Sequence, residues 1–238
     1  MMPDLNCDLG EGESSTRTRA LMRWITSANI ACGGHAGNVD TMRLCLQLAR
    51  RFRVHAGAHP GAPDREGFGR GRVRLTPAQF ELLLWQQVAA LEKIARTENI
   101  PLHHIKLHGS LYHLSEAEPL MARRYVLAVK RWWPRTIIYA RANGLVVRSA
   151  RKFSVPVWPE AFADRAYEKN GSLVARDQPG ALLTRRDEIQ RRLEDLKQGR
   201  VTTISGEKLA VRCRTICLHS DTPGAVRSVR LIRAFLSK

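Results

Sequence analysis

The chain has 238 residues, 44% of them hydrophobic, and its 39 Lys and Arg against 22 Asp and Glu give a formal net charge of +17. This length and apolar content suffice for a sizeable buried core, and no apolar run approaches the roughly 18–20 residues that a membrane-spanning helix needs. The N-terminus shows no secretory signal, and the five cysteines form no Cys-x-x-Cys pair. We therefore expect a cytoplasmic protein with reduced thiols and no membrane partner.

The positive charge is a first functional indication, because basic proteins often bind nucleic acid. The arginines are spread through every segment, however, with no basic tail and few interleaved aromatic residues. We interpret them as solvated helix surface and expect no specific nucleic-acid site. A basic nucleic-acid-binding protein remains an alternative of a different class, and it would show tight, steeply salt-dependent binding.

The first half of the chain alternates predicted strands with polar clusters and helices. Four apolar runs are typical of strands, at residues 1–5, 24–32, 53–57 and 103–107. Asn38 is placed to cap a helix after the second run. Thr76-Pro77 with Gln79 indicates another helix start. Thr76 is the N-cap, Pro77 occupies the first helical position, and Gln79 can complete a capping box with Thr76. We expect that helix to end near Glu98.

The second half repeats this alternation. Three further strands are predicted at residues 136–140, 155–158 and 214–218, and residues 168–183 are expected to be irregular. Helix starts are predicted at Ser115 with Glu118, at Thr184 with Asp187, at Asn143, and at Thr222-Pro223.

The densest polar cluster lies in residues 54–72, directly after the third predicted strand. Within a dozen residues, 59–70, it holds five ionisable side chains among glycines and two prolines: His59, Asp64, Arg65, Glu66 and Arg70. Glycine permits tight turns and close approach of a ligand, and proline restricts the loop. The pattern favours a binding loop at a strand end.

The order of the elements favours an α/β barrel. Strands that alternate with helices pair in parallel through right-handed crossovers. Six of the seven predicted strands are followed at once by ionisable residues, and the C-terminal strand ends are where parallel α/β folds bind ligands. We predict a single barrel domain over residues 1–238, distorted because it has seven strands.

In such a barrel the polar clusters converge on one face. They contribute Asp8, Glu11, His35, His59, Lys106, His108, Glu160, Asp164, Arg165, His219 and Asp221. Carboxylates with imidazoles supply general acid–base catalysis near neutral pH, and a carboxylate with two imidazoles also supplies a divalent-metal site. The sequence leaves both uses open.

Other histidines and other chemistries are less well supported. His55, His103 and His104 lie within apolar runs and are interpreted as structural. The chain has no G-x-x-x-x-G-K-[ST] loop for a nucleotide and no G-x-S-x-G elbow. Gly67 to Arg72 could still hold a phosphate or carboxylate through amides and arginine.

The clusters carry long motifs that together resemble the LamB/YcsF family. The motifs are Asn6-Cys7-Asp8-Leu9-Gly10-Glu11, Ala28 to Gly33 with His35-Ala36-Gly37, Gly57-Ala58-His59-Pro60, Gly67-Phe68-Gly69-Arg70, Lys106-x-His108-Gly109-x-Leu111-Tyr112, Glu160-x-Phe162-Ala163-Asp164-Arg165-x-Tyr167 and His219-x-Asp221-Thr222-Pro223. They follow the family's order over nearly the whole chain.

The resemblance implies a fold and an activity. The fold is a distorted seven-stranded, TIM-like β/α barrel of the glycoside hydrolase/deacetylase type. The activity is that of the A subunit of the ATP-dependent 5-oxoprolinase, which opens the lactam of 5-oxo-L-proline to L-glutamate. The resemblance further implies that ATP is shared with partner subunits B and C, which fits the missing nucleotide loop, and a homo-oligomer is also compatible.

The implied reaction assigns roles to the clustered residues. A carboxylate or His59 acts as base toward water, and Lys106 and Arg70 neutralise developing charge. We assign catalysis to Asp8, Glu11, His59, Lys106, His108 and Asp164, and substrate binding to His35, Arg70, Glu160, Arg165, His219 and Asp221. The alternative is a metal-dependent amide hydrolase or deacetylase that needs no ATP, with a divalent metal on Asp8, His35 and His59.

Overall fold

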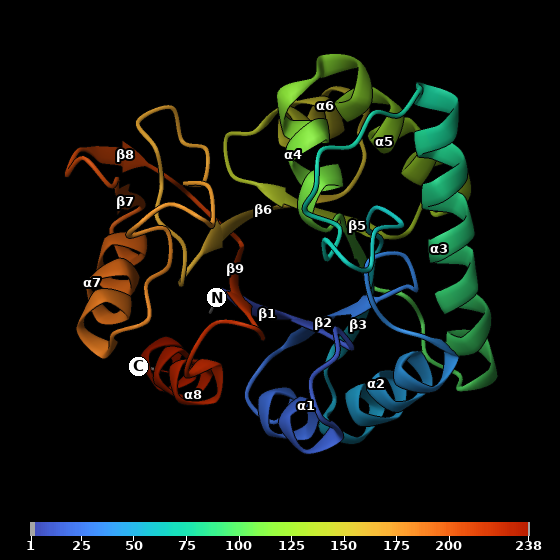
Figure 1. The fold of residues 1–238 in the computed structure, drawn as a ribbon, viewed down its shortest axis with the longest axis horizontal. Coiled ribbons are helices and arrows are strands. Elements are labelled where there is room, and N and C mark those ends of the chain that lie inside the picture. The colour runs from blue at the N-terminus through green and yellow to red at the C-terminus, as the bar shows by residue number, and fades with distance from the viewer. Residues whose placement is uncertain (1–2, 238) are drawn as a thin grey trace.

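A computed structural model describes residues 3–237, and within them seven parallel strands form a closed barrel. The order is β1-β2-β3-β4-β5-β6-β9, with helices around the outside (Figure 1). The strands are Asp4–Leu9 (β1), Ser27–Ala31 (β2), His55–His59 (β3), His104–Lys106 (β4), Ile137–Arg141 (β5), Val157–Phe162 (β6) and Thr215–His219 (β9). The predicted seven-stranded α/β barrel is confirmed.

Eight helices lie between or after the strands within the described residues. They are Ser15–Met22 (α1), Val39–Phe52 (α2), Pro77–Thr97 (α3), Gly109–Ala117 (α4), Pro119–Trp132 (α5), Leu145–Lys152 (α6), Arg186–Lys197 (α7) and Ala225–Leu236 (α8). Two predicted helix starts are confirmed in detail, because Asn38 and Thr76 each accept a backbone N–H three residues on within a capping box. None of the described helices is both long and apolar enough to cross a bilayer.

Four predicted helix starts differ from the structure, and one of them is Asn143, since α6 begins two residues later at Leu145. Ser115 lies inside α4, where it is buried and donates to the Tyr112 carbonyl. Helix α7 begins at Arg186, because the Glu188 carboxylate accepts the backbone N–H groups of Thr184 and Arg185 and so closes the turn one residue later than expected. Helix α8 begins only after Gly224, whose φ of 76° ends the preceding turn.

The first strand is longer than predicted, and this changes where its polar residues lie. The prediction ended at Leu5, whereas β1 continues to Leu9. Successive side chains of a strand point to opposite faces. Leu5, Cys7 and Leu9 therefore join the apolar core outside the sheet, and Asn6 and Asp8 point into the barrel.

The barrel interior below the mouth is closed by stacked rings. His104 is fully buried and stacks on Tyr139 at 4.0 Å between ring centroids, and Tyr139 stacks on Trp158 at 5.3 Å. Residue 57 must be glycine here, because a Cβ atom on it would lie 2.2 Å from the His104 ring. His104 Nε2 lies 2.7 Å from Asn29 Oδ1 and so supports the layer above.

An unpredicted hairpin extends the fold beside the barrel. It consists of Arg200–Thr202 (β7) and Lys208–Ala210 (β8), which pair antiparallel next to α7 (Figure 1). Buried Arg192 of α7 donates to the carbonyls of Phe162 and Arg165, so the helix fixes the chain where it leaves β6.

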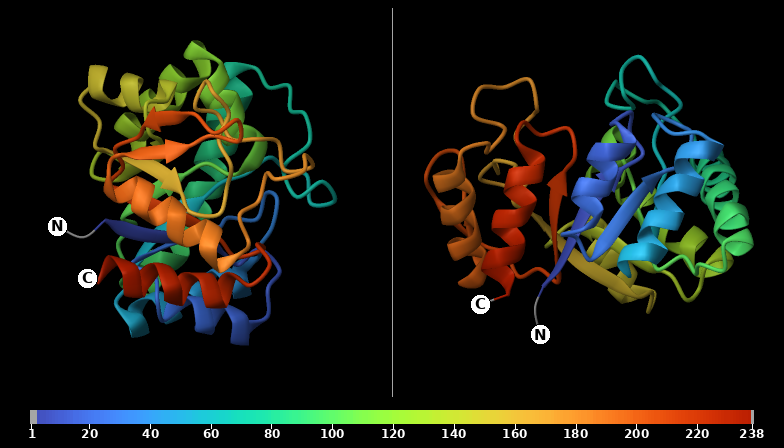
Figure 2. Two further views of the ribbon diagram at one scale, coloured as in Figure 1. Left: turned by 90° about the vertical axis from the view of Figure 1, so that its left-hand side faces the viewer. Right: turned by 90° about the horizontal axis from the view of Figure 1, so that it is seen from below.

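Two long loops project from one end of the barrel. They are the segment between β3 and α3 and the segment between β6 and α7, and both chain ends lie at the opposite end (Figure 2). The second segment was predicted to be irregular and holds isolated bridges, Arg165 with Leu182 and Tyr167 with Leu173. These loops surround the barrel mouth where the C-terminal strand ends meet.

Candidate active site

The barrel mouth contains a cavity of about 570 Å³. Its lining combines charged, imidazole and aromatic side chains from both halves of the chain: Asp8, His59, Arg70, Lys106, His108, Tyr112, His113, Phe162, Arg165, Arg176, Asp177 and His219, among others. The convergence expected from the sequence is therefore observed. Asp8 Oδ2 lies 3.4 Å from His59 Nε2 and 3.9 Å from His219 Nε2, which joins the two halves.

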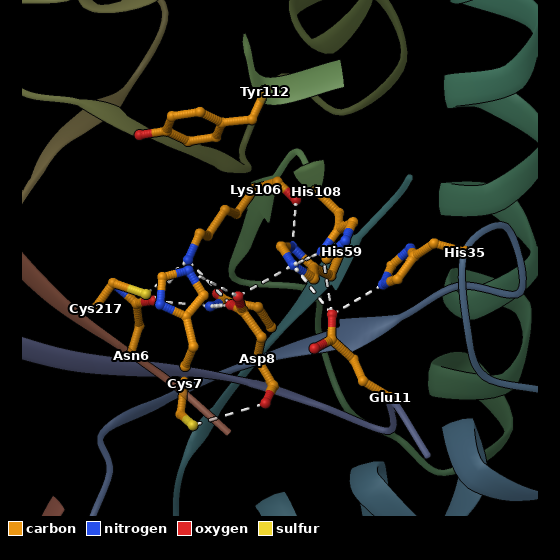
Figure 3. A network of polar contacts seen from close by, with 12 residues as sticks. Asn6, Cys7, Asp8, Glu11, His35, His59, Lys106, His108, Tyr112 and Cys217 are labelled. Carbon is orange, nitrogen blue, oxygen red and sulfur yellow. Dashed lines mark hydrogen bonds and ion pairs between the residues drawn. The ribbon is translucent and has the colours of Figure 1, made fainter. Parts of the chain in front are cut away.

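Lys106 forms the floor of the cavity. Its Nζ lies 3.0 Å from Asp8 Oδ1 and 3.1 Å from Glu160 Oε1, and it also contacts Asn6 and Cys217 (Figure 3). Only 2% of Lys106 is exposed. Burial alone would lower the pKa of Lys106, but Asp8 and Glu160 hold this pKa well above its ordinary value. The floor is therefore a charged ammonium between two carboxylates.

Asp8 is held as an anion at the centre of the site. Asn29 on β2 is paired with Asp8 on β1, and its side-chain amide donates to Asp8 Oδ1 at 2.6 Å. Burial would raise the pKa of Asp8, but His59 and Lys106 hold this pKa well below its ordinary range. The same Asp8 carboxylate, acting against burial, raises the pKa of His59.

Three histidines converge on Glu11. Its Oε1 lies 2.8 Å from His35 Nε2, 3.2 Å from His108 Nδ1 and 3.5 Å from His59 Nε2 (Figure 3). Burial lowers the pKa of His35 to about 4 and also lowers that of His108. Each of the four residues follows or ends a different strand, β1 to β4 in order.

Asp164 orients His219. The Asp164 carboxylate accepts from the His219 ring Nδ1 at 3.0 Å, from the His219 backbone N–H at 3.0 Å and from the Thr222 hydroxyl at 2.6 Å. Burial alone would raise the pKa of Asp164, but His219 lowers it to about 2. The Nδ1 proton thus faces Asp164, and the lone pair of a neutral His219 is on Nε2.

The rim of the cavity is basic. Arg70 and Arg176 both bind Asp221, at 2.6 and 2.7 Å. Arg165 donates to the Val174 carbonyl at 2.6 Å, and its buried Nε has no hydrogen-bond partner among the described residues. Burial and the neighbouring Arg176 lower the pKa of Arg165 to about 10. The residue lines the cavity, so its positive charge faces any anion that enters.

Some predicted site residues do not line the cavity. Within residues 3–237 the lining omits Glu11, His35, Glu160, Asp164 and Asp221. Glu160 was assigned to substrate binding, yet it is fully buried, binds Lys106 and Asn6, and accepts from Tyr112. The predicted metal ligands were Asp8, His35 and His59. In the structure His35 and His59 lie in one group with Glu11 and His108, and Asp8 lies in a second group with Cys217 and His219.

Sequence reasoning missed several residues of the site. Asn6 and Asn29 link Asp8, Glu160 and Lys106, and Cys217 contacts the Lys106 ammonium. Burial raises the pKa of the Cys217 thiol well above its ordinary value, so Cys217 is a neutral neighbour. The signal for Asn6 was its spacing of two from Asp8, which places both on one face of a strand.

The chain matches the LamB/YcsF family model over residues 3–238. It belongs to the LamB/YcsF family. A relative from Nitrobacter winogradskyi, named as the A subunit of 5-oxoprolinase, is 42% identical over 99% of this chain and 94% of its own length, and one of the same name from Pyrococcus abyssi is 39% identical over 100% and 95%. A crystal structure called lactam utilization protein, from Thermus thermophilus, superposes with a TM-score of 0.90 at 35% identity, covering 100% of this chain and 96% of that one.

Proposed function

We propose that this LamB/YcsF protein is the A subunit of an ATP-dependent 5-oxoprolinase. It would open the cyclic amide of 5-oxo-L-proline to L-glutamate together with partner subunits B and C. Full-length similarity to relatives that carry this name is the observation on which the proposal rests. The chemistry of the mouth supports it, because ammonium, carboxylate, imidazole and guanidinium groups face one cavity.

The cavity suits a small anionic lactam. Arg165 lines it, and a planar guanidinium matches the geometry of a carboxylate. Phe162 and Tyr112 add apolar surface for the ring carbons. In this arrangement Arg165 holds the substrate carboxylate and the lactam carbonyl points toward Lys106.

Lactam opening needs an activated carbonyl, since an amide is a poor electrophile. Transfer of the γ-phosphoryl group of ATP to the lactam oxygen gives ADP and a phosphorylated amide. Water then adds to the former carbonyl carbon, and the bond from this carbon to the ring nitrogen breaks. The acyl phosphate that results is hydrolysed by a second water to L-glutamate and phosphate.

His219 is the best-placed base for the attacking water. It lines the cavity, and Asp164 fixes its ring so that Nε2 presents a lone pair. This reassigns His219 from substrate binding to catalysis, with Asp164 as its positioning residue. Lys106 and Arg70 would neutralise charge that develops on the phosphorylated oxygen.

ATP binding is proposed to be shared with the partner subunits. The chain lacks a P-loop sequence. A cavity of about 570 Å³ exceeds what a single five-membered ring requires, which leaves space for a phosphoryl group at the basic rim.

A reconstitution assay tests this function. Glutamate formed from 5-oxo-L-proline and ATP is measured with the complete set of subunits and with each one omitted in turn. We expect turnover only with ATP and all subunits, and little or none from this chain alone. Rapid glutamate release by this chain without ATP would overturn the proposal and favour a metal-dependent amide hydrolase.

A further inference from the structure

Two arginines that line the cavity bind one carboxylate from two different loops. Arg70 belongs to the segment between β3 and α3, and Arg176 to the segment between β6 and α7. Asp221, which follows β9, accepts from Arg70 Nη2 at 2.6 Å and from Arg176 Nη1 and Nη2 at 2.7 and 3.0 Å. The carboxylate therefore holds two guanidinium groups side by side at the rim.

This pairing leaves most of the donor capacity of the two guanidinium groups unused. An arginine side chain has five N–H donors. Toward described residues, Arg70 uses one of them and Arg176 uses two. The two side chains are 34% and 19% exposed, so a ligand can reach them. Arg70 Cζ also lies 4.6 Å from the centre of the Phe68 ring, which supports the plane of this guanidinium.

The charge of the rim is not balanced by its carboxylates. Arg165 is a third guanidinium nearby. Burial lowers its pKa, and the charges of Arg176 and Arg70 lower it further. Against these three cations the rim has two carboxylates, Asp221 and the exposed Asp177. The excess positive charge favours an anion beside the arginine pair.

We propose that Arg70 and Arg176 bind the phosphoryl group that the reaction transfers, and that Asp221 occupies their site as an internal anion until this group enters. The identity of the ligand as the transferred phosphoryl group rests on the proposed function. In this account Asp221 is a positioning residue and not, as predicted from the sequence, a substrate ligand.

The chemistry of the two anions explains the exchange. A phosphoryl group has a charge of about −1.5 to −2 at neutral pH and three acceptor oxygens, whereas a carboxylate has one charge and two oxygens. Arginine binds phosphate through two parallel N–H···O bonds. A phosphoryl group can therefore take both guanidinium groups from Asp221, and in its absence the Asp221 carboxylate keeps the two cations together.

A second triad of the same composition provides a matched control. At the start of α7, Asp187 binds Arg185 at 3.1 Å and Arg191 at 2.8 Å. The Asp187 side chain is 50% exposed, and these three residues do not line the mouth cavity. This triad shows whether two arginines around an aspartate suffice to bind phosphate outside the cavity.

Titration calorimetry of the full chain with inorganic phosphate at constant ionic strength tests the site. Asp221→Asn should bind phosphate at least ~10-fold more tightly than wild type, because the competing charge is lost. Adding Arg176→Gln to Asp221→Asn should weaken binding at least ~10-fold, since hydrogen bonds to charged groups are among the stronger ones. Asp187→Asn should bind as wild type does, and thermal midpoints confirm that each variant is folded.

ATP titrated in the same way distinguishes two sources of the phosphoryl group. Tighter ATP binding by Asp221→Asn, cancelled by Arg176→Gln, would place the terminal phosphate of the nucleotide at the arginine pair. Tightening confined to inorganic phosphate would place the group there after its transfer. Both results support the site.

An Asp221→Asn chain that binds phosphate no more tightly than wild type would overturn the proposal. Equal tightening in Asp187→Asn would also overturn it, because any freed arginine pair would then suffice. Glutamate release is measured separately with all subunits. Phosphate binding as expected without glutamate release would count against the proposed function alone.

Discussion

Replacing Lys106 with methionine is expected to cost both stability and activity. Methionine keeps the unbranched chain as far as the ε position but removes the ammonium. Asp8 and Glu160 would then remain buried without the cation that lies 3.0 and 3.1 Å from them. Breaking a buried ion pair by removing one partner costs about 3–5 kcal/mol.

The expected loss can be converted to a thermal shift. For a chain of this length, 1 kcal/mol corresponds to roughly 2–4 °C in midpoint, so Lys106→Met should lower Tm by roughly 6–20 °C. The variant should still fold, because Asn6, Asn29 and Tyr112 continue to donate to the two carboxylates.

The pH dependence of this loss is the distinctive signature. Lys106 helps to keep the pKa of Asp8 well below its ordinary range, so that pKa should rise in the variant. A carboxyl group with a raised pKa binds its proton at higher pH in the folded state. The difference in unfolding free energy between wild type and variant should therefore be large at pH 8 and smaller at pH 5.

Urea unfolding of both proteins at the two pH values measures this difference, and kcat of the assembled complex measures activity. We expect kcat to fall at least ~100-fold, about the effect of removing one oxyanion-stabilising donor. The double variant Glu160→Gln/Lys106→Met also removes the buried Glu160 charge that Lys106 would have paired, so it should be more stable than Lys106→Met alone. A loss below 1 kcal/mol, as for an exposed pair, would refute the reasoning.

Three further results are expected. The pKa of Asp164 is about 2 against an ordinary 3.8, which contributes about 2 kcal/mol to the free energy of unfolding above pH 4. This contribution is lost as the pH falls toward 2, so in Asp164→Asn the free energy of unfolding should change less with pH over that range. Gly57→Ala should lower the free energy of unfolding in denaturant by about 1–3 kcal/mol, because the new Cβ would overlap the His104 ring. An unchanged denaturation midpoint would show that the His104 ring can move aside at little cost. Duplex DNA should bind no tighter than ~10⁻⁶ M near physiological salt, and a sub-micromolar Kd measured by anisotropy would contradict the interpretation of the +17 charge as solvated arginine.

The barrel could be predicted because its pattern is local and repeated. Each strand is a short apolar run followed by polar residues, and caps such as Thr76 with Gln79 mark helix starts through contacts three residues apart. The convergence of the strand-end residues then follows from parallel topology. Strand ends were less predictable, since the polar residues Asn6 and Asp8 are typical of a strand end, whereas in β1 they point into the barrel.

The division of the site into two clusters was not predictable from the sequence. It depends on which donor atoms meet across strands. The sequence analysis grouped Asp8 with His35, whereas in the structure Glu11 lies beside His35. The role of His219 depends likewise on a hydrogen bond to Asp164, 55 residues away. The hairpin β7–β8 was missed because its strands, Arg200–Thr202 and Lys208–Ala210, are only three residues long, too short for an alternation to be distinctive.

The most direct test of the proposed function is the glutamate-release rate of the complete complex carrying His219→Gln. The structure places this imidazole in the cavity with its Nδ1 proton directed at Asp164. A lost general base should lower kcat by about 10²–10⁴-fold. Assembly with the partners should stay near normal, as should the rate of a His55→Gln control, whose exposed side chain lies at the opposite end of β3. A His219→Gln complex that releases glutamate within a few-fold of the wild-type rate would contradict the assignment of His219 as the base.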